Sequence, residues 1–325
     1  MTVISAKHAL QAAVEAARWA PSVHNTQPWT FVVSEQEIGL RADTDRKLRE
    51  SDVSGRELLI SCGAALFTMR TAMRCEGFEP VVRTLPDPDR PSLLATLRPG
   101  AEARADETVK VLGGEIERRR THRAGFADVP VPDRVVERLV LAAMEECAKL
   151  TPVRSPDAIK VIAGLTQAAQ GVQAQDRRFG LEMIRWARSP DSSGTDGVPA
   201  QGYPREAART DPLFPQREYG WQPGWGSGAG QEGAAAVGVV AVLTTRGDSR
   251  QDWIDAGQAL QHVLLEASAY GVSAAFHTQA LELEPLREFL RLQLCSGEYP
   301  QMIMRLGVTF DDKESIRRPL SEIVE

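Results

Sequence analysis

Two long segments of the chain repeat a pattern of small residues that limits how it can fold. The segment "GAALFTMRTAMRCEG" (63–77) aligns with "GQALQHVLLEASAYG" (257–271), so that Gly63 meets Gly257. Both segments are predicted to be helices followed by a strand, and helices with small residues on one face can approach closely. The repeat therefore predicts two related halves that imitate a homodimer within one chain. The alternative is chance similarity, since Gly and Ala are common in packed helices.

Composition and charge indicate a globular protein rather than a nucleic-acid or membrane protein. The 325 residues are 42% hydrophobic and 25% charged, and the net charge is −6 with a pI near 5.6. An acidic chain disfavours general binding to nucleic acids, and no apolar run approaches the roughly 18 residues that a membrane helix needs. The four cysteines form no CxxC pair, and the N-terminal residues lack the pattern of a signal peptide. We therefore expect reduced thiols and a cytoplasmic location.

The predicted elements mix long helices with strands, as in an α/β or α+β protein. A boundary near residues 100–105 would divide the chain into a first half, 1–104, and a second half, 105–325. Periodicity, caps and turn residues predict helices at 5–19, 55–76, 105–119, 133–148, 156–188, 251–270 and 284–292, and strands at 30–33, 79–84, 92–98, 234–245, 273–277 and 301–306.

Residues 189–233 differ in composition from the rest of the chain. They are rich in Gly, Pro, Ser and Asp, and they contain aromatic residues such as Tyr203, Phe214 and Tyr219. A loop of this length within a compact domain is usually a lid, a binding loop or a disordered segment. Because disordered segments are poor in aromatic residues, we expect an ordered, lid-like insertion.

A polar loop precedes the first strand. The stretch "APSVHNTQPWTFVV" (20–33) carries Ser22, Asn25 and Gln27 directly before Trp29. Amide side chains offer a donor and an acceptor, which suits the edge of a flat heteroaromatic ring. In an ordinary turn the same side chains would cap backbone groups. Both interpretations stay open from these residues alone, and Trp29 is expected in the core under either.

Arginines cluster at two places. Residues 118–123 read "RRRTHR", and Arg317 and Arg318 lie near the end of the sequence. Arginine binds phosphate in a bidentate manner, but arginines near the C-terminus of a helix can also complement its dipole in water. The five histidines form no HxH or HExxH pair, so no metal site is expected, and "GWGSGAG" (224–230) lacks the preceding strand of a dinucleotide loop.

Together these motifs resemble the nitroreductase-like flavoproteins. "APSxxNxQPWxF" before a strand is similar to the signature loop of that family, and "RRTHRAGF" is similar to its Arg-Arg-Ser-x-Arg-x-Phe phosphate motif. The long insertion, "EYPQMIMRLG" and the terminal "RRPLSEIV" are most similar to the Acg-type branch, in which two nitroreductase-like halves are fused. The resemblance covers most of the chain through separated motifs. It implies an α+β nitroreductase-like fold, internally duplicated so that one chain mimics the family homodimer.

The resemblance also implies an FMN site between the halves. Ordinary members bind FMN at their subunit interface, with the arginine motif of one subunit at the phosphate and the polar loop of the other at the ring. Each motif occurs once in this chain, in opposite halves, so one complete site is predicted. By match to the family's pattern, the cofactor-binding residues are Arg119, Arg120, Thr121, Arg123 and Arg317 at the phosphate and ribityl end, Ser22, Asn25 and Gln27 at the ring, and Thr278 and Gln279 near flavin N5 and O4.

The function that the resemblance implies is an oxidoreductase that passes hydride from NAD(P)H through FMN to a nitroaromatic, a quinone or a similar acceptor. No side chain has to act as nucleophile or acid, because the hard chemistry belongs to the cofactor. The alternative is an FMN-sequestering protein, in which the insertion 189–233 shields the ring and prevents turnover. The expected partners are small molecules, with no nucleic acid and no membrane, and the chain would be a monomeric pseudo-dimer or a weak homo-oligomer.

Overall fold

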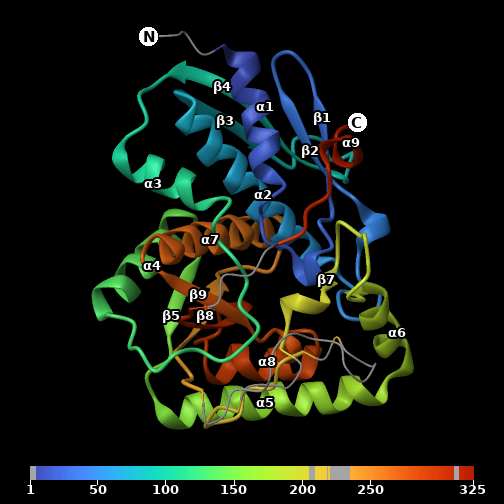
Figure 1. Ribbon diagram of the computed structural model, residues 1–325, viewed down its shortest axis with the longest axis vertical. Coiled ribbons are helices and arrows are strands. Elements are labelled where there is room, and N and C mark those ends of the chain that lie inside the picture. Colours follow the sequence, from blue (N-terminus) through green and yellow to red (C-terminus); the bar gives the residue numbers. More distant parts are fainter. Residues whose placement is uncertain (1–4, 205–208, 218, 220–234, 311–314) are drawn as a thin grey trace.

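Two four-stranded antiparallel sheets organise the protein. The computed structural model describes residues 5–204, 209–217, 219, 235–310 and 315–325 (Figure 1). The sheet of the first half lies in the upper part of Figure 1 and that of the second half in the lower part. The first half consists of α1 (Ala6–Ala17), β1 (Trp29–Val33), β2 (Ile38–Ala42), α2 (Arg56–Cys75), β3 (Phe78–Thr84) and β4 (Leu93–Glu102).

The second half adds a long insertion to the same plan. This insertion separates β5 from β8, whereas a short turn joins the corresponding β1 and β2. The elements are α3 (Glu107–Glu115), α4 (Asp133–Glu145), β5 (Lys149–Pro152), α5 (Pro156–Gln175), α6 (Arg177–Trp186), β6 (Ala187–Arg188), β7 (Val198–Pro199), β8 (Val239–Thr245), α7 (Arg250–Ala269), β9 (Val272–Phe276), α8 (Glu284–Gln293), β10 (Tyr299–Val308) and α9 (Leu320–Ile323).

The strand order is the same in the two sheets. It is β1-β2-β4-β3 in the first and β5-β8-β10-β9 in the second, and all neighbouring strands are antiparallel. The long helices α2 and α7 occupy equivalent places, each directly before an edge strand. The internally duplicated α+β fold is therefore confirmed, while the division of the chain between residues 104 and 105 stays a prediction.

The aligned glycines of the repeat meet where α2 crosses α7. A Cβ atom added to Gly63 would lie 2.2 Å from the carbonyl oxygen of Ile254, and one added to Gly257 would lie 2.0 Å from that of Ile60. Both separations are far inside van der Waals contact, so glycine alone permits this approach of the two backbones. The crossing joins the two halves at the centre of the molecule (Figure 1).

Local capping explains where several helices begin. Ser5 Oγ accepts the backbone N–H of His8 at the start of α1, and Ser249 with Asp252 forms a capping box on α7. Asp176 has extended backbone, and its carboxylate accepts the N–H of Arg178 at 2.8 Å. The prediction of one helix over 156–188 is therefore wrong, because α5 ends and α6 begins at this cap.

Two short strands, β2 and β5, were not predicted. The sequence of β2, "IGLRA", contains a glycine, and β5, "KLTP", is a four-residue edge strand that ends in proline. Strands this short owe their conformation to the ladder with a partner strand rather than to their own propensity. Strand β2 pairs with the neighbouring β1 and with the distant β4, and β5 pairs with the distant β8.

Candidate functional site

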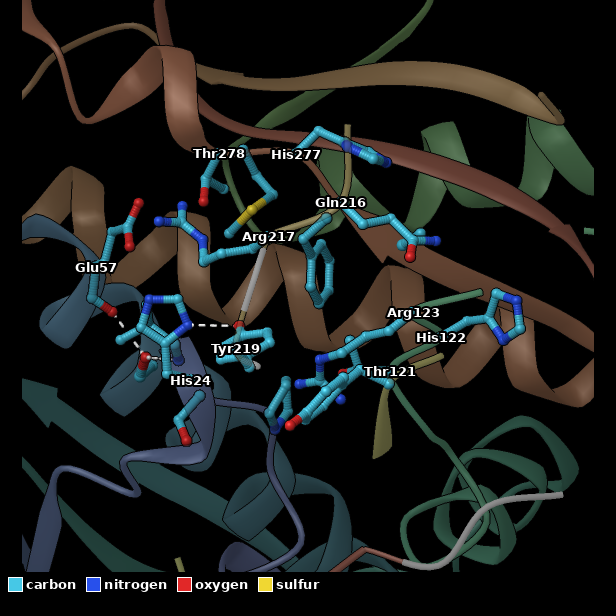
Figure 2. Close-up of a pocket in the computed structure, with 18 of the residues that line it drawn as sticks. His24, Glu57, Thr121, His122, Arg123, Gln216, Arg217, Tyr219, His277 and Thr278 are labelled. Atoms are coloured by element: carbon cyan, nitrogen blue, oxygen red, sulfur yellow. Dashed lines mark hydrogen bonds between the residues drawn. The ribbon is translucent and has the colours of Figure 1, made fainter. Parts of the chain in front are cut away.

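Two joined chambers lie between the halves, and Figure 2 shows the larger. Their volumes are about 290 Å³ and about 40 Å³. They share Pro21, Ser22, Thr121 and Arg123 as wall residues, so the two chambers are adjacent. The large chamber is lined by residues of the polar loop, α2, α7, β9 and the segment 203–219, and the small chamber by residues of the segments 21–25, 120–123, 197–202 and 315–317.

The backbone of the polar loop is tightly wound. His24, Asn25 and Gln27 have φ values of 46°, 54° and 48°, in the left-handed region that residues other than glycine rarely adopt. The N–H of Gln27 donates to Ser22 Oγ at 2.9 Å. The completely buried Trp29 follows and fixes the loop to the core, as predicted. Together these contacts hold Ser22 at the junction of the two chambers.

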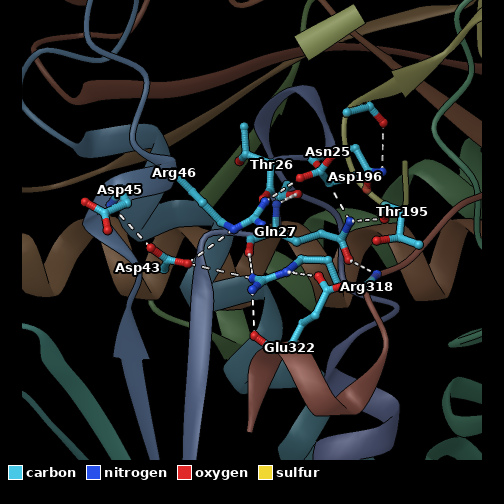
Figure 3. Close-up of polar contacts among 12 residues, drawn as sticks. Asn25, Thr26, Gln27, Asp43, Asp45, Arg46, Thr195, Asp196, Arg318 and Glu322 are labelled. Carbon is cyan, nitrogen blue, oxygen red and sulfur yellow. Dashed lines mark hydrogen bonds and ion pairs between the residues drawn. The ribbon is translucent and has the colours of Figure 1, made fainter. Parts of the chain in front are cut away.

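Both amides of the loop bind the backbone of distant segments (Figure 3). Asn25 Nδ2 donates to the carbonyl oxygen of Gly197, and Gln27 Nε2 donates to that of Thr195, each at 2.9 Å. Gln27 Oε1 also accepts the N–H of Arg318 at 2.8 Å. Asn25 lines the small chamber, whereas Gln27 is completely buried and lines neither chamber. Gln27 therefore braces the loop, and its position does not support the predicted contact with a ring.

Three arginines line the small chamber, and none of its described lining residues is acidic. These arginines are Arg120, Arg123 and Arg317. Arg123 makes no hydrogen bond or ion pair with any described residue, and its guanidinium lies 6.0 Å from the centre of the Tyr219 ring. The Trp19 ring lies 5.7 Å from the guanidinium carbons of both Arg120 and Arg317. These distances are typical of cation–π interactions.

Arg119 lies behind this row of arginines. It is buried, its Nη1 donates to Thr121 Oγ1 and its Nη2 to the carbonyl oxygen of Trp19, both at 3.4 Å. Arg119 lines neither chamber but a third cavity of about 230 Å³. Burial, followed by repulsion from Arg120 and Arg123, lowers the pKa of Arg119 to about 9. The predicted phosphate motif is thus split between residues that line the chamber and one that supports them.

Arg317 is likewise buried close to other positively charged arginines. Burial lowers the pKa of its guanidinium well below the usual value, and repulsion from Arg119, Arg120 and Arg123 lowers it further. Its Nη1 donates to Asn25 Oδ1 at 3.1 Å, which connects it to the polar loop. Like charges held this close favour any bound anion, because an opposite charge stabilises the protonated state of each arginine.

Strand β9 leads to the far end of the large chamber. The N–H of His122 donates to the carbonyl oxygen of Ala274 at 2.8 Å, which joins the arginine motif to this strand. Thr278 lines the chamber, and its Oγ1 donates to Glu282 Oε1 at 3.1 Å. The neighbouring Gln279 is buried and lines neither chamber. Of the two residues predicted near flavin N5 and O4, only Thr278 faces the chamber.

A buried network of arginine and carboxyl side chains closes this end of the chamber, and its members were not predicted; Figure 2 shows two of them, Glu57 and Arg217. Glu57 and Arg217 line the chamber, Arg217 forms an ion pair with Glu282, and Arg56 Nη2 lies 2.9 Å from Glu57 Oε1. Burial, followed by repulsion from the charge of Glu282, raises the pKa of Glu57 to about 8, although the charge of Arg56 opposes the shift. No local motif marks these residues, because they come from segments far apart in the sequence.

The insertion supplies another part of the wall. Tyr203 and Tyr219 are buried and line the large chamber, and Tyr219 Oη lies 2.7 Å from His24 Nδ1. Burial lowers the pKa of His24 well below its usual value, and Arg217 and Arg123 lower it further, so the imidazole is neutral at physiological pH. The described part of the insertion packs on the protein, while Trp221, Trp225 and residues 224–230 lie outside the described residues.

The described residues carry neither a metal cluster nor a membrane helix. No group of three or more His, Cys, Asp or Glu side chains among them is arranged to hold a metal ion. Within the same residues, no helix combines the length and apolarity that a membrane span requires.

Comparison with known proteins gives the same family as the motifs. The model of the Nitroreductase family matches residues 6–51 and 116–308, which include the polar loop and the arginine motif. The chain belongs to the nitroreductase family. The resemblance drawn from the motifs is confirmed.

Curated relatives cover nearly the whole chain. "Putative NAD(P)H nitroreductase Rv3131" of Mycobacterium tuberculosis H37Rv is 32% identical over 316 residues, which are 94% of this chain and 88% of that protein. "Putative NAD(P)H nitroreductase acg" of the same strain is 27% identical over 324 residues, 97% of this chain and 94% of that protein. Among solved structures, a nitroreductase with bound FMN from Desulfitobacterium hafniense DCB-2 is 15% identical, with a TM-score of 0.40 over 67% of this chain and 97% of that one.

Proposed function

We propose that the protein is an FMN-dependent oxidoreductase that passes hydride from NAD(P)H to a nitroaromatic, a quinone or a similar small acceptor. The observation that carries this proposal is a small arginine-lined chamber that shares four wall residues with a larger chamber, which has aromatic side chains in its wall. A phosphate attached to a planar ring system matches that arrangement in charge and shape. Membership of the family supports the proposal, since two of the curated relatives carry the name "Putative NAD(P)H nitroreductase".

The phosphate would bind in the small chamber. Arg123 is the strongest candidate for a direct contact, because it makes no hydrogen bond or ion pair with a described residue and lines both chambers. Arg120 and Arg317 line the same chamber, and Arg119 adds positive charge from behind. Bidentate arginine contacts are well suited to phosphate oxygens.

The rest of the cofactor would extend past the junction into the large chamber. Ser22 and Thr121 place hydroxyl groups at that junction, where the ribityl chain would pass. Phe276 and Thr278 would border the ring at the far end of the chamber. FMN, when bound, supplies the hydride chemistry. The residues of the chain hold and orient it, exclude water and limit access to it.

Two titratable side chains in the wall of the large chamber, Glu57 and His24, affect the charge that a ligand meets there. The carboxyl of Glu57 is largely protonated at neutral pH, because burial raises its pKa to about 8. A neutral carboxyl at the chamber wall leaves the arginines as the main charges that a ligand meets. The imidazole of His24 is also neutral, which keeps positive charge concentrated at the phosphate end.

One observation favours a second candidate function, the sequestration of FMN. Tyr203, Gln216 and Tyr219 of the insertion line the large chamber, and Tyr219 is hydrogen-bonded to His24 of the opposite half. A nicotinamide must stack on the flavin ring to transfer hydride. If these side chains stay in place, they would keep NAD(P)H from the ring, and the flavin would be bound without turnover.

Two measurements separate these functions. The absorbance spectrum of the purified protein, with flavin quantified per chain, tests FMN binding and should give about one FMN per chain. Anaerobic stopped-flow mixing with NADPH and with NADH then tests turnover. Bleaching of the flavin band within seconds supports the reductase, whereas a flavin that stays oxidised supports sequestration. A protein that neither contains nor takes up FMN would contradict both.

A further inference from the structure

One wall of the small chamber is formed by residues 187–204, which we call the strap. Gly197, Val198, Pro199 and Gly202 of the strap face the chamber, across from the arginines and from residues 315–317 of the C-terminal tail. Strands β6 and β7 pair in parallel and close the base of the strap. The strap therefore forms one wall of the small chamber.

The tip of the strap is tied to the first half by an ion pair. Asp196 Oδ2 accepts a hydrogen bond from Arg46 Nη1 at 2.6 Å (Figure 3). Its other carboxylate oxygen is paired with Arg188 of the strap itself. Arg46 is held in turn by Asp43, with Nε and Oδ2 3.2 Å apart. The side chains of Arg46 and Asp196 are only 20% and 18% exposed, so solvent screens this pair less than a surface pair.

A second tie runs through the polar loop. Gln27 donates to the strap at Thr195 and accepts from the tail at Arg318, so one buried amide connects two walls of the chamber. The N–H of Gly197 donates to the carbonyl oxygen of Asn25 at 3.0 Å. Gly197 has a φ of 71°, and a Cβ there would lie 2.6 Å from the carbonyl oxygen of Trp186, so the turn at the strap tip requires glycine.

The element that leads into the strap is anchored separately. Glu182 of α6 accepts the N–H groups of Glu50 and Ser51 at 3.1 and 3.0 Å, and the Ser51 hydroxyl at 2.7 Å. A carboxylate that accepts several hydrogen bonds is a strong attachment. Loss of the contacts at residues 195–197 would thus free the tip of the strap while its base stays attached.

We infer that Asp196, Arg46 and Gln27 are positioning residues that hold the strap closed over the small chamber and set how fast a phosphate-bearing ligand enters and leaves. None of the three lines either chamber. They act through Gly197, Val198 and Pro199, which do line it. The nature of the ligand rests on the proposed function, whereas the closure itself does not.

The experiment compares Asp196→Asn and Arg46→Gln with the native protein. Association and dissociation rates of FMN are followed by the fluorescence of the free flavin. Both variants should exchange FMN about tenfold faster in both directions, because each removes a charge-assisted hydrogen bond that closes the strap. The matched control is Asp191→Asn, since Asp191 is exposed in the same strap and pairs with no described residue. Asp196→Glu keeps the charge and should restore part of the slow exchange.

The outcomes distinguish a strap that controls entry and exit of FMN from a mutation that only weakens the binding of FMN. Unchanged rates in both variants would overturn the inference, as would faster release without faster association. Hydrogen exchange of residues 189–204 in flavin-free protein gives a readout that needs no cofactor. Faster exchange there in Asp196→Asn, but not in Asp191→Asn, supports closure, and equal exchange rejects it. If the native protein binds no FMN, the proposed function fails, and the hydrogen-exchange result still decides the inference about the strap.

Discussion

The two central helices are equivalent by the repeat, yet their matching polar residues have different surroundings. The alignment that pairs the two crossing glycines also pairs Glu57 with Gln251 and Ser61 with Asp255. On α2, Glu57 and Ser61 line the large chamber. On α7, Gln251 Nε2 donates to Asp255 Oδ1 at 2.9 Å, and Gln258 Nε2 donates to the same atom at 3.2 Å. Gln251 and Asp255 line none of the three cavities described above.

The loops that precede β1 and β5 also differ, because only the loop before β1 lies beside the chambers. Residues 18–28 join α1 to β1 and form the polar loop beside the chambers, whereas residues 146–148 alone join α4 to β5. A connection this short has no room for a second polar loop. A duplicated fold can therefore keep its framework and still build a ligand site on one side only, because the framework depends on packing and the site depends on loops.

The largest effect is expected where α2 of the first half crosses α7 of the second half. Gly63→Ala should lower the free energy of unfolding by about 3 kcal/mol, because the new methyl group would overlap the backbone of α7. Denaturant unfolding measures this change. The control is Gly164→Ala in α5, where a Cβ meets nothing within 4 Å and the helix should gain about 0.5–1 kcal/mol. Equal stability of Gly63→Ala and native protein would disprove the close crossing.

The next largest effect is expected from the arginines in and behind the wall of the small chamber. Arg123→Ala should weaken FMN binding about 100-fold, because it removes charge-assisted hydrogen bonds to the phosphate. Arg119→Ala should also deplete the flavin, by loss of positive charge behind the chamber. Titration of apoprotein with FMN gives the affinities. Arg104 lines neither chamber, so Arg104→Ala should bind FMN normally; full flavin content in both motif variants would refute the phosphate assignment.

A smaller effect should come from the aromatic residue behind the arginines. Trp19 follows the C-cap of α1, and Cys147 follows the C-cap of α4. Trp19→Leu removes the ring that lies against Arg120 and Arg317, and FMN affinity should fall about fivefold. Trp19→Phe should lose less, and Cys147→Ala should lose nothing. Equal affinities of Trp19→Leu and native protein would show that the ring does not organise the arginines.

The smallest effect concerns Glu57, whose counterpart on α7 is Gln251. The folded-state pKa of Glu57 is raised to about 8, so the folded protein retains a proton that the unfolded chain loses above about pH 4.5. Stability should consequently fall as pH rises from about 5 to 8. Glu57→Gln removes this contribution, so its unfolding free energy should decline less over that range than that of the native protein. Parallel pH profiles of the two proteins would contradict the raised pKa.

Much of the fold was predictable because it follows from local patterns. The glycines of the repeat marked the α2–α7 crossing, and apolar periodicity located most long helices and strands. The errors have local causes as well. The cap at Asp176 divides a segment that has continuous helical periodicity, and β5 is held in place by pairing with β8 rather than by its own sequence.

The candidate site was predictable in part. Its motifs predicted Ser22 at the ring and Thr121 and Arg123 at the phosphate and ribityl end of FMN. The structure places all three on the walls that the two chambers share, and their contacts with FMN stay predictions. The same motifs offered no way to separate Asn25, which lines a chamber, from Gln27, which does not. Both carry the same amide group within one loop. What separates them is which distant backbone each amide meets.

The sequence by itself determined the family, the repeat and the segments that carry polar and basic side chains, because these depend on residue identity and spacing. Tertiary structure alone decided that Gln27 connects the strap to the tail, that Glu57 and Arg217 close the large chamber, and that Arg119 stands behind the other arginines. Hydrogen-bond partners, burial and pKa depend on groups brought together from segments far apart in the chain. No local pattern encodes that proximity.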